Sequence, residues 1–167
     1  MGRIRQGLAV LGATAALSCA AIGSAWAQQE LPVVPLDPIE GTWRTVSLSE
    51  VTITVCPDGF CGVLSNIVVP EGLLSGAEAE AAAALGPENF FDERNQDPAL
   101  RSRPMLGLQI LTLVPSDKPD IYDGTIYNPE DGGTYKATIT PVDADTLRLK
   151  GCIVWPLCKT QTWTRIK

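Results

Sequence analysis

Hydrophobic and polar residues alternate with a period of two in many short segments of this chain, a pattern typical of half-buried β-strands. In the segment "EVTITVC", Val51, Ile53 and Val55 share one face, and Thr52 and Thr54 share the other. Eight such segments are separated by turn residues: 41–48, 50–56, 60–69, 106–114, 120–128, 134–140, 145–153 and 160–167. Short strands at this spacing predict an all-β sandwich or barrel.

The connections between these segments favour a barrel over a sandwich. Hairpin turns join most neighbouring strands, which predicts an eight-stranded antiparallel up-and-down barrel. One helix is expected between the third and fourth strands, over Ser75–Leu85, "SGAEAEAAAAL". Ser75 can cap it, Glu78 stands at the capping-box spacing, and Gly86 followed by Pro87 ends it. We expect this alanine-rich helix to pack on the sheet as a short lid or plug.

The N-terminus has the pattern of a secretory signal. Arg3 and Arg5 precede an apolar run over 7–23, and Ala25-Trp26-Ala27 supplies small residues for a signal peptidase. We therefore predict a signal peptide over 1–27 and a periplasmic or secreted protein. A membrane anchor, or a lipoprotein signal with Cys19 lipidated, fits these residues less well.

The expected mature chain is one acidic domain. Residues 28–40 hold three prolines and predict an extended arm, and 41–167 form the predicted barrel domain. Cleavage leaves 11 of the 13 Lys and Arg residues against 19 Asp and Glu, a net charge of −8. Such a charge disfavours binding to nucleic acid or to anionic membranes. No later segment is long and apolar enough to span a bilayer.

Four cysteines remain after cleavage: Cys56, Cys61, Cys152 and Cys158. An even number in an exported chain predicts two disulfides, for which three connectivities exist. The short spacings suit two local bridges, each across a turn. A zinc site is disfavoured because the chain has no histidine and the expected compartment is oxidising, so we predict no metal and no cofactor.

Little recognisable catalytic chemistry is present. The lack of histidine excludes His-based triads, and no P-loop, dinucleotide fingerprint or nucleophile elbow occurs. Only carboxylate, Tyr, Ser or Lys chemistry remains, so an enzyme is the less favoured class. Asp92, Glu93 and Arg94 predict a solvated charged cluster. The alternative is that Asp92 or Glu93 forms half of a catalytic carboxylate pair.

The segment "NQDPALRSRPMLG", residues 95–107, offers the best candidate polar site. Arg101 and Arg103 have the same parity, so an extended backbone makes them a fork for a carboxylate or phosphate, beside Asn95 and Asp97. The favoured alternative is a rigid connector, in which Asn95 or Asp97 caps a turn and the arginines bond backbone carbonyls. The two hypotheses differ in where these side chains point.

The segment "IYNPEDGGTY" predicts a turn between two strands at Asp131-Gly132-Gly133. Its acidic residues offer too few oxygens for a calcium site. Tyr127 and Tyr135 flank the turn and are expected to be cross-strand partners.

Two patterns resemble known families. Gly41-Thr42-Trp43 on the first strand and Arg165 on the last resemble the structural signature of lipocalins and their calycin relatives. The resemblance implies that Trp43 closes one end of the barrel and that Arg165 packs across its ring. Both roles are structural.

A longer series of segments resembles the bacterial exported family catalogued as domain of unknown function 2147. It runs from residue 41 to 165 and includes "GTW", "VTITVC", "FCGVL", "NQDPALRSRPMLGLQIL", "DGTIYNPEDGGTYKATIT", "DTLRLKGC" and "LCKTQTWTR". The resemblance implies export and supports the fold, but it implies no activity.

An eight-stranded barrel either fills its interior or holds one small ligand. We therefore predict an exported protein that binds a small, partly apolar ligand in or at the mouth of the barrel. The alternative is a protein–protein interaction or envelope-structural module with a filled barrel. A carboxylate-based enzyme ranks last, and no particular protein partner is indicated.

Overall fold

The computed structural model describes residues 36–68, 75–84, 86–154 and 156–166, all within a compact unit that spans 35–167. The predicted signal peptide and residues 28–35 of the predicted arm lie outside the described residues. No helix in these described ranges is both long enough and apolar enough to cross a membrane.

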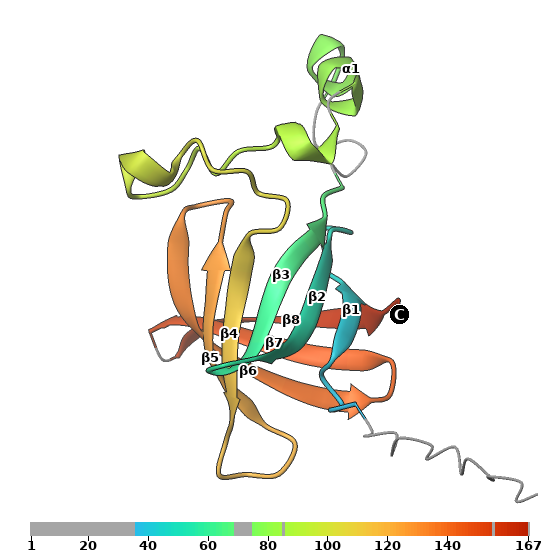
Figure 1. The fold of residues 1–167 in the computed structure, drawn as a ribbon, viewed down its shortest axis with the longest axis vertical. Helices are drawn as coiled ribbons and strands as arrows, with labels where there is room; N and C mark the ends of the chain where they lie inside the picture. The colour runs from blue at the N-terminus through green and yellow to red at the C-terminus, as the bar shows by residue number, and fades with distance from the viewer. Residues whose placement is uncertain (1–35, 69–74, 85, 155, 167) are drawn as a thin grey trace, which may run out of the picture. The chain divides into compact units, whose positions relative to one another are not determined.

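The described chain forms a closed antiparallel barrel in which each strand pairs with its neighbours in sequence and β1 pairs with β8 (Figure 1). The strands are β1 (Gly41–Arg44), β2 (Glu50–Cys56), β3 (Gly59–Asn66), β4 (Gln109–Pro115), β5 (Tyr122–Asn128), β6 (Gly133–Asp143), β7 (Thr146–Val154) and β8 (Leu157–Arg165). This confirms the predicted eight-stranded up-and-down fold.

The alternation in sequence becomes an inner and an outer face of the barrel wall. On β7, Leu147 and Leu149 are buried while Arg148 and Lys150 are exposed. Successive side chains of a strand point to opposite faces, so each strand contributes every second residue to the interior. Burial of these apolar side chains is the main force that closes the barrel.

Up-and-down topology separates the connections into two ends. The β1–β2, β3–β4, β5–β6 and β7–β8 connections lie at one end, which we call the open end. The other three connections lie at the opposite end, called here the closed end. There the side chain of Ile39 is buried, and its carbonyl accepts a hydrogen bond of 2.8 Å from Trp43 Nε1.

Arg165 completes the closed end. Its guanidinium carbon lies 4.0 Å from the centre of the Trp43 ring, within the range of a cation–π interaction. It also donates hydrogen bonds to three backbone carbonyls, those of Pro38, Glu40 and Ala144. Trp43 and Arg165 therefore lie in contact at the closed end, the arrangement that the lipocalin-like signature implies.

A long insertion separates β3 from β4. It contains α1 (Ala77–Ala84) and two short 3₁₀ helices, η1 (Pro87–Asn89) and η2 (Pro98–Leu100). The helix lies within the predicted range. However, its described side chains, Ala77, Glu80, Ala81 and Ala84, are exposed, so these four positions do not pack on the sheet as a lid would.

Two local disulfides form, one at each end of the barrel. Cys56–Cys61 bridges β2 and β3 at the closed end, and Cys152–Cys158 bridges β7 and β8 at the open end. Of the three possible connectivities, the structure has the one that joins sequence neighbours.

Candidate ligand-binding site

The barrel interior is hollow toward the open end. A cavity of about 760 Å³ lies there, lined by residues from most strands and from three connections. Its apolar wall is formed by Val51, Leu64, Ile110, Ile126, Leu149 and Trp163. Toward the closed end the interior is filled by other buried side chains, such as Ile53, Ile139 and Leu147. The barrel therefore has a packed floor and an open upper half.

Small inward residues explain why the upper half stays open. Ala137 on β6 pairs with Gly151 on β7, and Gly151 pairs with Lys159 on β8. An added Cβ at Gly151 would meet only Ile126 Cγ2, at 3.8 Å, within 4 Å. The next inward residue toward the closed end on β7 is Leu149, which is buried. Side-chain volume thus falls sharply at the level of Gly151.

Polar side chains gather around the mouth. The lining includes Thr45, Ser47 and Ser49 from the β1–β2 connection, Asn128, Glu130 and Asp131 near the β5–β6 turn, and Lys159 and Gln161 on β8. Lys159 and Gln161 were not among the site residues predicted from the sequence. A signal was available, because both interrupt the apolar inward row of β8 between Leu157 and Trp163.

Apolar side chains also reach solvent at this mouth. Val46, Ile153 and Leu157 line the cavity, yet each is more than half exposed. Exposed apolar side chains beside a cavity favour partly apolar occupants.

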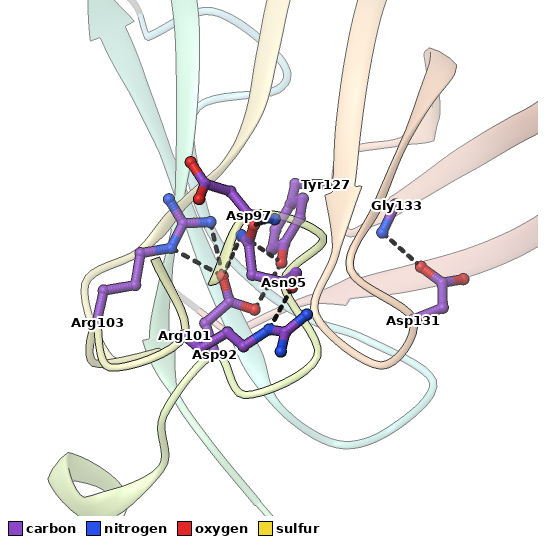
Figure 2. A network of polar contacts seen from close by, with 8 residues as sticks. All are labelled: Asp92, Asn95, Asp97, Arg101, Arg103, Tyr127, Asp131 and Gly133. Carbon is purple, nitrogen blue, oxygen red and sulfur yellow. Dashed lines mark hydrogen bonds and ion pairs between the residues drawn. The ribbon is translucent and has the colours of Figure 1, made fainter. Parts of the chain in front are cut away.

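A buried carboxylate holds the insertion to the barrel wall beside this cavity (Figure 2). Asp92 is fully buried. Its Oδ1 accepts a hydrogen bond of 2.5 Å from the Tyr127 hydroxyl, and its Oδ2 accepts one of 2.8 Å from Asn95 Nδ2. Arg103 donates to the same Oδ2 through Nε at 2.8 Å and Nη2 at 2.7 Å. We call Asp92, Asn95, Arg103 and Tyr127 the Asp92 cluster.

The prediction that Asp92 belongs to a solvated face is therefore wrong, whereas Glu93 and Arg94 are exposed as predicted. Burial alone raises the pKa of Asp92. Hydrogen bonds from Tyr127, Asn95 and Arg103, together with the Arg103 charge, outweigh that effect and lower the pKa below its usual value. Burial and the nearby Asp92 carboxylate raise the pKa of Tyr127. At neutral pH the carboxylate is charged and the phenol is protonated, which keeps the cluster bonded.

The remaining contacts of 95–107 are those of a rigid connector. Asp97 caps η2 by accepting from the Ala99 amide at 2.9 Å. Arg101 Nε donates to the Asn95 carbonyl at 2.8 Å, as the connector hypothesis expects. Arg103 instead bonds a carboxylate. None of the four residues predicted to contact ligand, Asn95, Asp97, Arg101 and Arg103, lines the cavity. Their role in binding stays a prediction.

Tyr127 joins the Asp92 cluster to the cavity, because it is one of the residues that line the cavity and its hydroxyl bonds Asp92. The prediction that Tyr127 and Tyr135 are cross-strand partners is wrong. The register pairs Tyr127 with Thr134 and Tyr135 with Ile126. Each tyrosine hydroxyl bonds an aspartate instead, Asp92 and Asp131 respectively.

The β5–β6 connection is a hydrogen-bonded turn, as predicted. Asp131 accepts from the Gly133 amide, the Tyr135 hydroxyl and Asn128 Nδ2. Burial raises the pKa of Asp131, but these bonds outweigh it and lower the pKa overall. Across the described part of the chain, no group of three or more His, Cys, Asp or Glu residues is arranged to hold a metal ion.

A closed eight-stranded up-and-down barrel with Trp43 and Arg165 packed at one end and a cavity at the other is a lipocalin-like, calycin-type barrel. Residues 41–165 match the family described as "Uncharacterized protein conserved in bacteria (DUF2147)", and the chain belongs to this family.

Among solved structures, the chain resembles one titled "Protein HP1028 from the human pathogen Helicobacter pylori belongs to the lipocalin family". The TM-score is 0.57 and the sequence identity 22%, over 77% of this chain and 82% of that one. This likeness shows a shared fold. No curated protein shows a significant match.

Proposed function

We propose that this protein is an exported binder of a small, partly apolar molecule, which it holds in the cavity at the open end. The observation that carries the proposal is a cavity of about 760 Å³ with an apolar wall and a polar mouth. Small-molecule sites are mostly apolar, have volumes of about 300–1,000 Å³ and contain a few polar groups that orient the ligand.

The disulfides support export. Both pairs of cysteines are bonded, and disulfides persist mainly in oxidising compartments such as the periplasm or the extracellular space. The predicted signal peptide over 1–27 is the second support, because it would deliver the chain to that compartment.

The two rival functions have less support. A structural or interaction module was expected to have a filled barrel, and the upper half of this one is hollow. A carboxylate-based enzyme would use a carboxyl group that is free to exchange protons in a cleft. The fully buried carboxylate Asp92 has both oxygens engaged by its own neighbours.

The test is to fill the cavity from a position that tolerates a side chain. Gly151 has an ordinary backbone conformation and 3.8 Å of clearance to Ile126 Cγ2, so Gly151→Phe places a ring in the cavity. The matched control is Lys150→Phe, one residue earlier on the exposed face of β7. Binding of the neutral fluorophore N-phenyl-1-naphthylamine is titrated, and native mass spectrometry records any small molecule that co-purifies.

We expect the wild type and Lys150→Phe to bind alike, and Gly151→Phe to bind at least about tenfold more weakly while melting as one cooperative transition. A tenfold loss equals about 1.4 kcal/mol of binding free energy. Equal binding by the filled variant, or a wild type that binds no probe and purifies empty, would refute the proposal.

A further inference from the structure

We propose that the cavity selects an amphiphile with a single carboxylate head group, which binds Lys159 at the mouth while its apolar body lies against the deeper wall. This inference rests on the proposed function and adds to it the chemical class of the ligand. It also moves the polar contact away from the arginines that the sequence suggested.

Lys159 lies in the row of β8 residues that faces the barrel interior, the row of Gln161 and Trp163. Leu157, Lys159, Gln161 and Trp163 all line the cavity, with Leu157 and Lys159 exposed at its mouth, whereas the alternating residues Thr160, Thr162 and Thr164 do not line it. Among the described residues, Lys159 is the only Lys or Arg that lines the cavity. An anionic group inside the cavity therefore has one cationic partner.

The Lys159 ammonium group has no ion pair or side-chain hydrogen bond within the described part of the chain, where the ion pairs are Arg44–Glu50 and Arg103–Asp92. Arg101 is engaged by the Asn95 carbonyl. A cation loses favourable hydration when a ligand covers it, so a covering ligand binds best when it brings an opposite charge. Lys159 is free to give such a contact, whereas Arg101 and Arg103 already bond the protein.

The space beside Lys159 suits a head group. Its cross-strand neighbour is Gly151, and the next residue in that row is Ala137, so no large side chain competes for the room. One inward step toward the closed end, Leu149 pairs with Gln161, and Trp163 follows on β8. From Lys159 toward the closed end, the lining thus changes from cationic to apolar along the barrel axis, which orients an amphiphile with its head at the level of Lys159 and its apolar body toward the closed end.

The acidic residues of the mouth limit the charge of the ligand. Glu130 and Asp131 also line the cavity, and Asp131 keeps its negative charge because three hydrogen bonds stabilise it. A single carboxylate at Lys159 is attracted by one cation and faces two anions farther along the rim. A dianion such as a phosphate monoester gains less from one lysine and is repelled more by the two acids.

The experiment compares a fluorescent polyene fatty acid, cis-parinaric acid, with its methyl ester, which has the same apolar body and no charge. We expect the wild type to bind the acid about five- to tenfold more tightly than the ester, the effect of one charge-assisted hydrogen bond. Lys159→Gln should remove this preference, so that acid and ester bind with similar affinity. Lys150→Gln removes the same charge from the outer face of β7 and should leave the preference intact.

The possible outcomes distinguish failure of this inference from failure of the proposed function. If acid and ester bind the wild type equally, or if Lys159→Gln and Lys150→Gln weaken the acid alike, the head-group assignment is wrong while cavity binding stands. If an alkyl phosphate displaces the probe better than the matching carboxylate, selection for a single charge is wrong. If neither probe binds the wild type, both proposals fail.

Discussion

Asp92 shows how one buried side chain attaches the insertion to the barrel wall. Its carboxylate binds Arg103, which lies eleven residues later in the same insertion, and it also binds Tyr127 on β5. The ring of Tyr127 also lies 5.2 Å from the Arg103 guanidinium carbon, which adds a cation–π contact. Because Tyr127 lines the cavity, the cluster also fixes part of the cavity wall.

Asp92→Asn should lower the free energy of unfolding by about 2–3 kcal/mol at neutral pH. Breaking a fully buried ion pair costs about 3–5 kcal/mol, and a smaller loss is expected here because 33% of the Arg103 side chain is exposed. Urea denaturation measures the change. The exposed neighbour provides the control, since Glu93→Gln should stay within about 0.5 kcal/mol of the wild type.

The same substitution should have a pH signature. The folded state lowers the pKa of Asp92, so its stabilisation is fully present above the unfolded pKa of about 3.9 and is lost as pH falls through the folded value. The stability difference between wild type and Asp92→Asn should therefore shrink on acidification below about pH 4. A difference that stays constant from neutral to strongly acidic pH would contradict this role for the carboxylate.

Side chains of this kind were the hardest to predict from the sequence. Asp92 stands between exposed residues in a segment that has no alternation of apolar and polar residues. The local sequence therefore indicates a solvated position. Its burial depends on Tyr127, 35 residues away, and that pairing arises only when the insertion folds back onto β5. For Asp97 and Arg101, the local capping and carbonyl contacts were foreseeable, because both partners lie within six residues.

At the scale of elements, the strands were predictable because each carries its own alternation and its own turn residues. The first strand is the main difference. It was expected over 41–48 but ends at Arg44, and the next residues form a connection in which Leu48 has a positive φ of 67°. The cavity was not predictable in the same way. An inward Gly151 or Ala137 looks like any other inward small residue until the opposing strands show that nothing fills the space.

The two disulfides allow an element-scale test with an internal control. They close loops of similar length, with sequence separations of five and six, so each should stabilise the fold by about 2 kcal/mol. Only Cys152–Cys158 borders the cavity, since Cys158 is part of its lining. Replacing both cysteines of either pair by serine should therefore lower stability similarly.

Binding should distinguish the two pairs. The Cys152→Ser, Cys158→Ser variant should bind N-phenyl-1-naphthylamine more weakly, because the β7–β8 hairpin that forms the mouth is no longer bridged. The Cys56→Ser, Cys61→Ser variant, altered at the closed end, should bind as the wild type does. Equal loss of binding in both variants would point to a general effect of lower stability.

At the scale of the whole molecule, closure of the barrel depends on a short pairing between the first and last strands, which we call the seam. Strand β1 pairs with β8 through Trp43 with Arg165 and Arg44 with Thr164, whereas most other neighbouring strands pair along their lengths. Arg165 strengthens this seam because it stacks on Trp43 and bonds the carbonyls of Pro38, Glu40 and Ala144.

Arg165→Lys should lower the free energy of unfolding by about 1–3 kcal/mol. Lysine keeps the charge but loses the planar fork that reaches several acceptors and the flat stacking on the indole. Thermal or urea denaturation measures the loss. Arg148→Lys, on the exposed face of β7, is the matched control and should be nearly neutral. Equal stability of both variants would show that the seam does not depend on the guanidinium.

The shortness of that seam also affects how the protein behaves when it partly unfolds. A closed barrel has no free strand edge, and this protects it from pairing with other chains. If the seam between β1 and β8 separates, two edges with unpaired amides and carbonyls become available at once, and β8 offers nine residues of backbone. Self-association through strand exchange should therefore begin at these two strands, well before the rest of the barrel unfolds.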